Sequence, residues 1–495
     1  MSTASRPKLT RQLGLMALTA TGVCSMLGAS INVVPFMIQR NVPGIGPYVL
    51  GAFLFAAVPA IFAAFAYAIL ASAMPRAGGS YIYASRGLHP YLGFIASFSQ
   101  WFGLSIVIGV ISYIIVPFIR DFTSSIGLYE VSVILEVGWV RVSIALLLIW
   151  SFIYVNIRGA KTYERVLLPM MFLMFALGAI VIVAGFMFDS SDFLVALKEK
   201  DGVDFSIISS AEFDWKIFLS AAALLFSSFI GFDSIAQAGS EAKDPTKNLP
   251  RAIFMAIFGV AIFYFLFTLA VYHTVPWSYV AEVSLQKDIT APGLLSYVLP
   301  SGLGAAILLG AAIALINDLP AMLLSVSRLM FAWAEDGIFP AAIAKIHSRK
   351  HTPYIALIAA GAMASVGVLG SHFAGDFFLG IDIMVTSMMV NFLLMCITLL
   401  TLPRVNPKLY NKISIIKSRT AQQFIGYVGS LLLFGFLIMH TYKDLSSEVS
   451  HWYFRSTPIW LIVMALASIL FFYRWKTQNG KDRVMAQKFK KLPEE

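Results

Sequence analysis

Twelve apolar runs, each long enough to cross a bilayer as a helix, dominate this sequence. About 20 residues of α-helix span the hydrocarbon core, because the helix rises about 1.5 Å per residue. The composition, with 59% hydrophobic and 13% charged residues among 495, departs from that of soluble domains. The runs lack the alternation of barrel strands, so we predict an all-α integral membrane protein with about 12 transmembrane helices. They cover residues 14–39, 46–74, 90–119, 141–157, 166–188, 216–240, 252–275, 302–333, 354–373, 377–402, 422–441 and 457–473.

Two of these runs are interrupted in the middle by small and polar residues. Residues 17–34 contain Gly22, Ser25, Gly28, Ala29 and Ser30. Residues 222–240 contain Ser227, Ser228, Gly231 and Asp233 at the same relative place, five helices later. Irregular backbone at membrane depth is tolerated only where protein or a water-filled cavity satisfies its polar groups. Paired breaks of this kind are typical of secondary transporters built from inverted repeats, with the substrate site at the breaks.

Lys and Arg are concentrated on one side of the predicted membrane plane. Short cytoplasmic loops carry such an excess, so we expect both termini to be cytoplasmic in a multi-pass protein of the cell membrane, the inner membrane in a Gram-negative bacterium. The loop at residues 189–216, on the other side, is acidic. The net charge of +10 therefore reflects topology, and no nucleic-acid partner is expected. The basic start of the chain predicts no removable signal peptide.

Four motifs, in the right order along the chain, resemble the amino acid, polyamine and organocation (APC) superfamily. The most specific is PRAGGSY at residues 75–81, continued by Pro90 and Gly93, which resembles the PRAGG-x-Y signature before span 3. The others are NIRG at 156–159, FIGFD at 229–233 followed by EAKDP at 241–245 and LPR at 249–251, and the segment from Arg328 to Pro340.

The resemblance implies a LeuT-type fold, in which helices 1 and 6 are broken and two inverted five-helix repeats precede two further helices. Applied to this chain, it implies a cytoplasmic N-terminal tail at 1–13 and a transporter core at 14–403, with repeats at about 14–188 and 216–403. Helices 11 and 12 then lie within 404–473, and a basic cytoplasmic tail, which we expect to be solvated, occupies 474–495.

The resemblance also implies a binding site at the breaks. Free N–H groups at a helix break suit a carboxylate, and free carbonyls suit an ammonium group. In the family the first break holds the substrate carboxylate, the sixth holds its amine, and span 3 lines the pathway. The chain departs from the family pattern at Cys24, Ser30 and Asn32. The substrate-binding residues implied are Met26, Leu27, Gly28, Ala29, Ser30, Gln100, Ser227, Ser228, Phe229 and Gly231.

Asp233 and Asp318 are carboxylates inside the predicted spans. Asp233 follows the sixth break, where it either takes part in proton-sensitive gating or caps the second half-helix. Asp318 lies near the middle of span 8, where a charge costs about 2.5–3.5 kcal/mol on insertion scales unless it faces a cavity or is neutralised. It could carry a proton or attract an amine. The gating and coupling residues predicted are Phe226, Phe232, Asp233 and Asp318.

Residue types that are missing bear on the coupling ion and on the chemistry. Residues 303–324 of span 8 contain no Ser or Thr, the residues that supply sodium ligands in relatives of this fold, so sodium coupling is disfavoured. Span 5 contains no Lys, which some proton-coupled family members keep. Cys24 and Cys396 lie in apolar runs, and no metal or cofactor motif is present.

We therefore predict an amino acid permease that works by alternating access, coupled to protons or exchanging substrates, with the lipid bilayer as its setting. A polyamine or other organic amine is the alternative substrate class, because Asp318 could pair with an additional amine. An enzyme is disfavoured because no nucleophile, base or metal cluster stands out. A channel is disfavoured because the paired breaks favour a carrier over a repeated filter.

Overall fold

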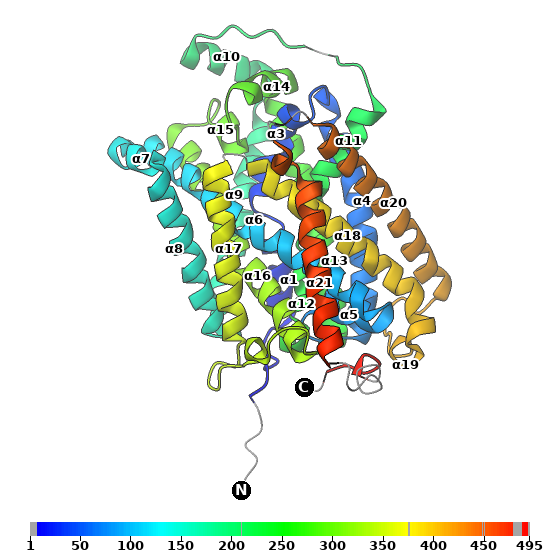
Figure 1. Ribbon diagram of the computed structural model, residues 1–495. Helices are drawn as coiled ribbons and strands as arrows, with labels where there is room; N and C mark the ends of the chain where they lie inside the picture. The colour runs from blue at the N-terminus through cyan, green and yellow to red at the C-terminus, as the bar shows by residue number, and fades with distance from the viewer. Residues whose placement is uncertain are drawn as a thin grey trace.

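Long helices packed side by side make up the computed structural model, which describes residues 7–208, 210–374, 377–447, 449, 451–478 and 488–493 (Figure 1). Within these residues, eleven helical segments are long and apolar enough to cross a membrane. Ten are continuous: α4 (Val49–Ala73), α6 (Pro90–Ser125), α8 (Gly138–Ile157), α9 (Ala160–Met187), α13 (Pro245–Thr274), α16 (Ser301–Glu335), α17 (Tyr354–Ala374), α18 (Phe377–Val405), α20 (Arg419–Ser446) and α21 (Ser456–Gln478). The prediction of an all-α membrane protein is confirmed.

Two spans are broken where the sequence places its small and polar residues. The first span is divided into α1 (Leu15–Cys24), α2 (Ala29–Asn32) and α3 (Val34–Asn41). The sixth is divided into α11 (Trp215–Leu225), the 3-10 turn η2 (Phe226–Phe229) and α12 (Ser234–Gln237). Together with the eleven membrane-length segments, the broken first span accounts for all twelve predicted spans.

Short helices cover the end of the bundle that is uppermost in Figure 1, among them α10 in the acidic loop. That helix forms because Asp189 caps it, accepting hydrogen bonds from the N–H groups of Ser191 and Asp192 at 2.8 and 3.1 Å. The Ser191 hydroxyl and these N–H groups hold the pKa of Asp189 below its ordinary value. The short elements at this end are α7 (Tyr129–Glu136), α10 (Ser190–Asp201), α14 (Trp277–Gln286) and α15 (Ala291–Leu295).

The opposite end, which we call the N-terminal face, is closed by buried ion pairs. Arg86 donates to both carboxylate oxygens of Asp336, at 2.5 and 2.9 Å, and Arg328 donates to both of Glu241, at 2.8 and 2.7 Å. All four side chains are at most 2% exposed. The motifs around residues 75–86, 241 and 328–336 thus hold helices together. Besides the elements already named, the described part of the chain contains six further short elements. They are α5 (Gly79–Gly87), α19 (Pro407–Tyr410), η1 (Gly46–Tyr48), η3 (Gly239–Glu241), η4 (Ala341–Ala344) and η5 (Trp452–Phe454).

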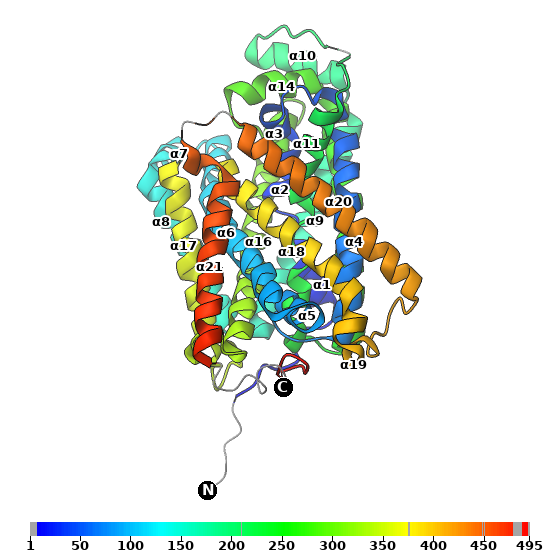
Figure 2. The same ribbon diagram turned by 45° about the vertical axis from the view of Figure 1, so that its right-hand side comes forward.

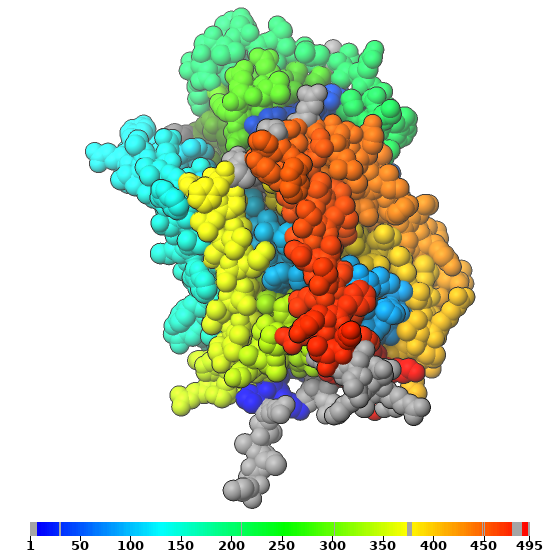
Figure 3. Space-filling model, in the orientation of Figure 1, coloured from blue at the N-terminus to red at the C-terminus, as the bar shows by residue number. Residues whose placement is uncertain are grey.

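The two last helices pack on the outside of the bundle. α20 lies against α4 and α18, and α21 lies against α6 and α18 (Figure 2). In the space-filling view, α17, α20 and α21 cover one side of the molecule (Figure 3).

Residues 488–493, which we call the C-terminal strap, dock on the N-terminal face. Arg76 and Arg86 donate to the carbonyls of Pro493 and Lys491, at 3.1 and 3.4 Å. Phe489 is 5% exposed, and the Arg86 guanidinium lies 4.9 Å from its ring centroid. Within the strap, which we expected to be solvated, Phe489 is buried whereas Lys488, Lys490 and Lys491 are exposed. Residues 1–6, 479–487 and 494–495 of the predicted tails lie outside the described residues.

Candidate functional site

The two helix breaks lie against each other in the middle of the bundle. Ser25 in the first break donates to the Ser234 hydroxyl at 3.2 Å. Gly231 in the second break has φ of 140°, and a β-carbon there would lie 2.5 Å from the carbonyl carbon of Ser25. Glycine is required at this position both by the backbone angle and by the close approach of the chains. The Tyr264 hydroxyl donates to the Met26 carbonyl and so satisfies one of the carbonyls that the break exposes.

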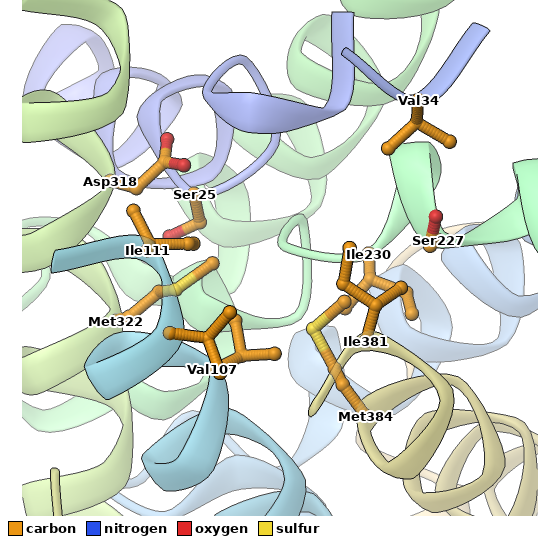
Figure 4. Close-up of a pocket in the computed structure, with 11 residues that line it drawn as sticks. Ser25, Val34, Val107, Ile111, Ser227, Ile230, Asp318, Met322, Ile381 and Met384 are labelled. Atoms are coloured by element: carbon orange, nitrogen blue, oxygen red, sulfur yellow. The ribbon is translucent and has the colours of Figure 1, made fainter. Parts of the chain in front are cut away.

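A cavity lies between the breaks and helices α6, α16 and α18 (Figure 4). Its walls are mostly aliphatic or methionine side chains. In Figure 4, Asp318 and Ser25 project from one side of the cavity and Ser227 from the other. Asp318 is the only ionisable residue among the eleven that line it, which are Ser25, Val34, Val107, Val110, Ile111, Ser227, Ile230, Asp318, Met322, Ile381 and Met384.

The Asp318 carboxylate lies directly against Gly28 of the first break. A β-carbon built on Gly28 would lie 2.6 Å from Asp318 Oδ1 and closer still to Oδ2. The neighbouring Asn317 donates from Nδ2 to the Cys24 sulfur at 2.9 Å. Both side chains are at most 2% exposed, so the polar middle of α16 is fixed against the broken first span. A carboxylate in this place can bind a cation that enters the cavity.

Asp233 belongs to a separate buried polar cluster, made up of Ser80, Gln100, Asp233, Gln237 and Asn391. Asp233 Oδ1 accepts from the Gly231 N–H at 3.1 Å, and Oδ2 accepts from Gln100 Nε2. The Gln100 carbonyl oxygen accepts from the Ser80 hydroxyl and from Gln237 and Asn391, the last two at 3.3 and 3.4 Å. Asp233 stands at the N-cap position of α12, but its side chain makes no capping hydrogen bond. The capping interpretation is therefore wrong.

The structure places the predicted binding residues in several environments. Ser227 lines the cavity, whereas Gln100 lies in the polar cluster and Leu27 lines a second cavity, together with residues of α9, α13 and α16. Ser228 and Phe229 are buried beside the sixth break, and neither lines the first cavity. Ala29 and Ser30 begin α2, and their side chains lie outside the described part of the chain.

The predicted aromatic gates pack against other aromatic rings. Phe232 stacks on Phe392 at 5.0 Å between ring centroids, and Phe226 meets the same ring edge-on at 6.0 Å. Neither phenylalanine is among the lining residues of the cavity. The sequence analysis also missed the aliphatic wall from α6, α16 and α18, since apolar residues in an apolar helix carry no distinguishing signal.

Comparison with known proteins identifies the family. A family model described as amino acid permease matches residues 13–476. The branched-chain amino acid permease BcaP of Bacillus subtilis is 25% identical over 388 residues, which are 75% of this chain and 76% of that protein. The low-affinity putrescine importer PlaP of Escherichia coli is 25% identical over 373 residues, covering 74% and 76%. Cationic amino acid transporter 4 of Mus musculus is 26% identical over 367 residues, covering 72% and 55%.

These matches confirm the resemblance to the APC superfamily that the sequence motifs indicate. The family model extends from the start of α1 to the end of α21, so it includes both broken spans and all the helices that form the cavity. On this match over nearly the whole sequence, the chain belongs to the amino acid permease family, whose members are transporters.

Proposed function

We propose that this permease moves a small molecule that bears an amino group, an amino acid or an organic amine, across the cell membrane by alternating access. The observation that carries the proposal is the cavity between the two broken helices, with one carboxylate in an otherwise uncharged wall. A cavity enclosed at the breaks suits a carrier, which must close over its substrate. The relatives include an amino acid permease and a putrescine importer, which supports both substrate classes.

The two halves of the core, residues 14–188 and 216–403, rock against each other around this cavity in the proposed cycle. The breaks occupy corresponding places in the two halves, as expected of inverted repeats. The N-terminal face is cytoplasmic in this proposal, because the basic residues gather there. Uptake of labelled amino acids and amines into liposomes that hold the purified protein tests the proposal. Uptake no faster than in protein-free liposomes for every compound would contradict it.

The transport cycle is proposed to be independent of sodium. Residues 303–324 of α16 contain no Ser or Thr, and Asn317 and Asp318 face the first break instead. Replacing external sodium by potassium is therefore expected to leave the initial rate of uptake into liposomes unchanged. A steep dependence of the rate on sodium would contradict this prediction, and protein-free liposomes measured in both salts control for leakage.

Asp233 is proposed to carry the coupling proton if a proton is coupled, because its carboxylate is fully buried beside Gly231 of the sixth break. In Asp233→Asn the side chain keeps an oxygen that can accept a hydrogen bond from Gln100. The amide can no longer take up or release a proton. We expect the variant to lose accumulation driven by a pH gradient and to retain exchange of internal for external substrate. Asp204→Asn, at a carboxylate that is 84% exposed in its side chain, is the matched control. Normal accumulation by Asp233→Asn would remove this residue from coupling.

A further inference from the structure

The Asp318 carboxylate stands at the first helix break and lines the cavity. It lies close enough to Gly28 that a single added carbon on that residue would collide with it. The protein itself thus places a negative charge from α16 at this break. An α-amino acid whose ammonium group paired with Asp318 would bring its own carboxylate close to the Asp318 carboxylate, because both groups are attached to one carbon, and the like charges would repel each other.

The rest of the cavity wall is uncharged and suits the part of a substrate that carries no charge. Eight of the eleven lining residues are Val, Ile or Met, and they come from α3, α6, α16, α18 and the sixth break. Ser25 and Ser227 are the two hydroxyls, and Ser227 Oγ has no hydrogen-bond partner among the described residues although the side chain is 2% exposed. An ammonium group placed against the aliphatic wall would be buried without a partner, which is strongly unfavourable.

We infer that the cavity binds monoamines: compounds with one ammonium group paired to Asp318, no carboxylate beside that group, and an uncharged body that lies against the aliphatic wall. This inference rests on the proposed function and narrows it. Branched or straight alkyl amines fit the class, with or without a neutral polar group that reaches Ser227. Amino acids and diamines fall outside it, the first because of the extra carboxylate and the second because of the extra ammonium group.

The test compares pairs of compounds that differ in one charged group. Isopentylamine is leucine without the carboxylate, and butylamine is putrescine without its second ammonium group. Binding of each to the purified full-length protein is measured by isothermal titration calorimetry, which avoids the passive diffusion of neutral amines through liposomes. We expect isopentylamine to bind about 10- to 100-fold more tightly than leucine, and butylamine more tightly than putrescine by a similar factor.

A pair of variants assigns the selectivity to Asp318. In Asp318→Asn the amide keeps the shape of the side chain and loses the charge, so isopentylamine should bind at least about tenfold more weakly while leucine binds no more weakly than to the natural protein. Asp204→Asn, at the exposed carboxylate, should change neither affinity. If Asp318→Asn cannot be purified in a folded state, Asp318→Glu replaces it. This variant should bind isopentylamine more weakly, because the longer side chain cannot keep its place against Gly28.

The outcomes separate this inference from the proposed function. Tighter binding of leucine than of isopentylamine, with leucine transported in liposomes, would overturn the inference and leave the proposed function standing. Tighter binding of putrescine than of butylamine would overturn it in favour of diamines. Failure of the protein to bind or transport any amine or amino acid would overturn both.

Discussion

Replacing Gly28 by valine is expected to abolish substrate binding while the protein still inserts and folds. Any β-carbon at this position collides with the Asp318 carboxylate, which lies 2.6 Å or less from where that carbon would be. The carboxylate is the end of a side chain and can rotate away, so the bundle survives. The binding group is nevertheless displaced from the cavity, and the branched side chain also crowds the irregular backbone of the first break.

Calorimetry with isopentylamine and leucine, together with the thermal unfolding temperature in detergent, checks this expectation. Gly259→Val is the matched control, because a β-carbon at Gly259 of α13 would have no neighbour within 4 Å. The double variant Gly28→Ala with Asp318→Ala relieves the collision, so its unfolding temperature should exceed that of Gly28→Ala alone while binding stays lost. Binding by Gly28→Val with the affinity of the natural protein would remove the first break from the site.

Replacing Arg328 by methionine is expected to lower the free energy of unfolding by about 3–5 kcal/mol. Arg328 and Glu241 are joined by two hydrogen bonds of 2.7 and 2.8 Å, and their side chains are 1% and 2% exposed. Removing the guanidinium leaves the Glu241 carboxylate buried without its charge partner. The effect is large because the remaining charge has lost its solvent as well as its counterion.

Two further variants serve as controls for the loss of stability in Arg328→Met. Arg120→Met breaks the ion pair between Arg120 and Asp121, whose side chains are 34% and 43% exposed, and should lower the free energy of unfolding by about 1 kcal/mol or less. Arg328→Met combined with Glu241→Leu removes both buried charges and should recover most of the stability that the single change loses. A loss in Arg328→Met no larger than that in Arg120→Met would show that the buried pair does not hold the N-terminal face together.

The membrane helices could be predicted because their signal is a continuous property of about 20 residues. The break of the first span could be placed from Gly28 and its small neighbours, and that of the sixth from Ser227, Ser228 and Gly231. The ends of the helices were less certain. α13 begins at Pro245, seven residues before the apolar run at 252–275, because proline suits the first helical turn and the charged residues there lie beyond the apolar segment.

The site could be predicted only where polarity marks a residue. Asp318 stood out as a charge in an apolar helix, but its position against Gly28 depends on how α16 is rotated against α1, which no pattern within one helix specifies. Gln100 was named because the resemblance places span 3 along the pathway, but it lies in the polar cluster with Asp233. Val107, Met322 and Ile381 line the cavity and are indistinguishable in sequence from residues that face lipid.

The body of the protein holds the C-terminal strap largely through the main-chain carbonyls of the strap. Asn406, Arg86 and Arg76 donate to the main-chain carbonyls of residues 490, 491 and 493, so most substitutions there keep these bonds. What the docking requires is an aromatic ring at Phe489 and a chain of suitable length after α21. Contacts to main-chain carbonyls tolerate changes of side chain in the strap, because the carbonyls remain. Because the strap touches α5, α16 and α19 at once, its docking energy favours whichever conformation of the permease keeps those three helices together.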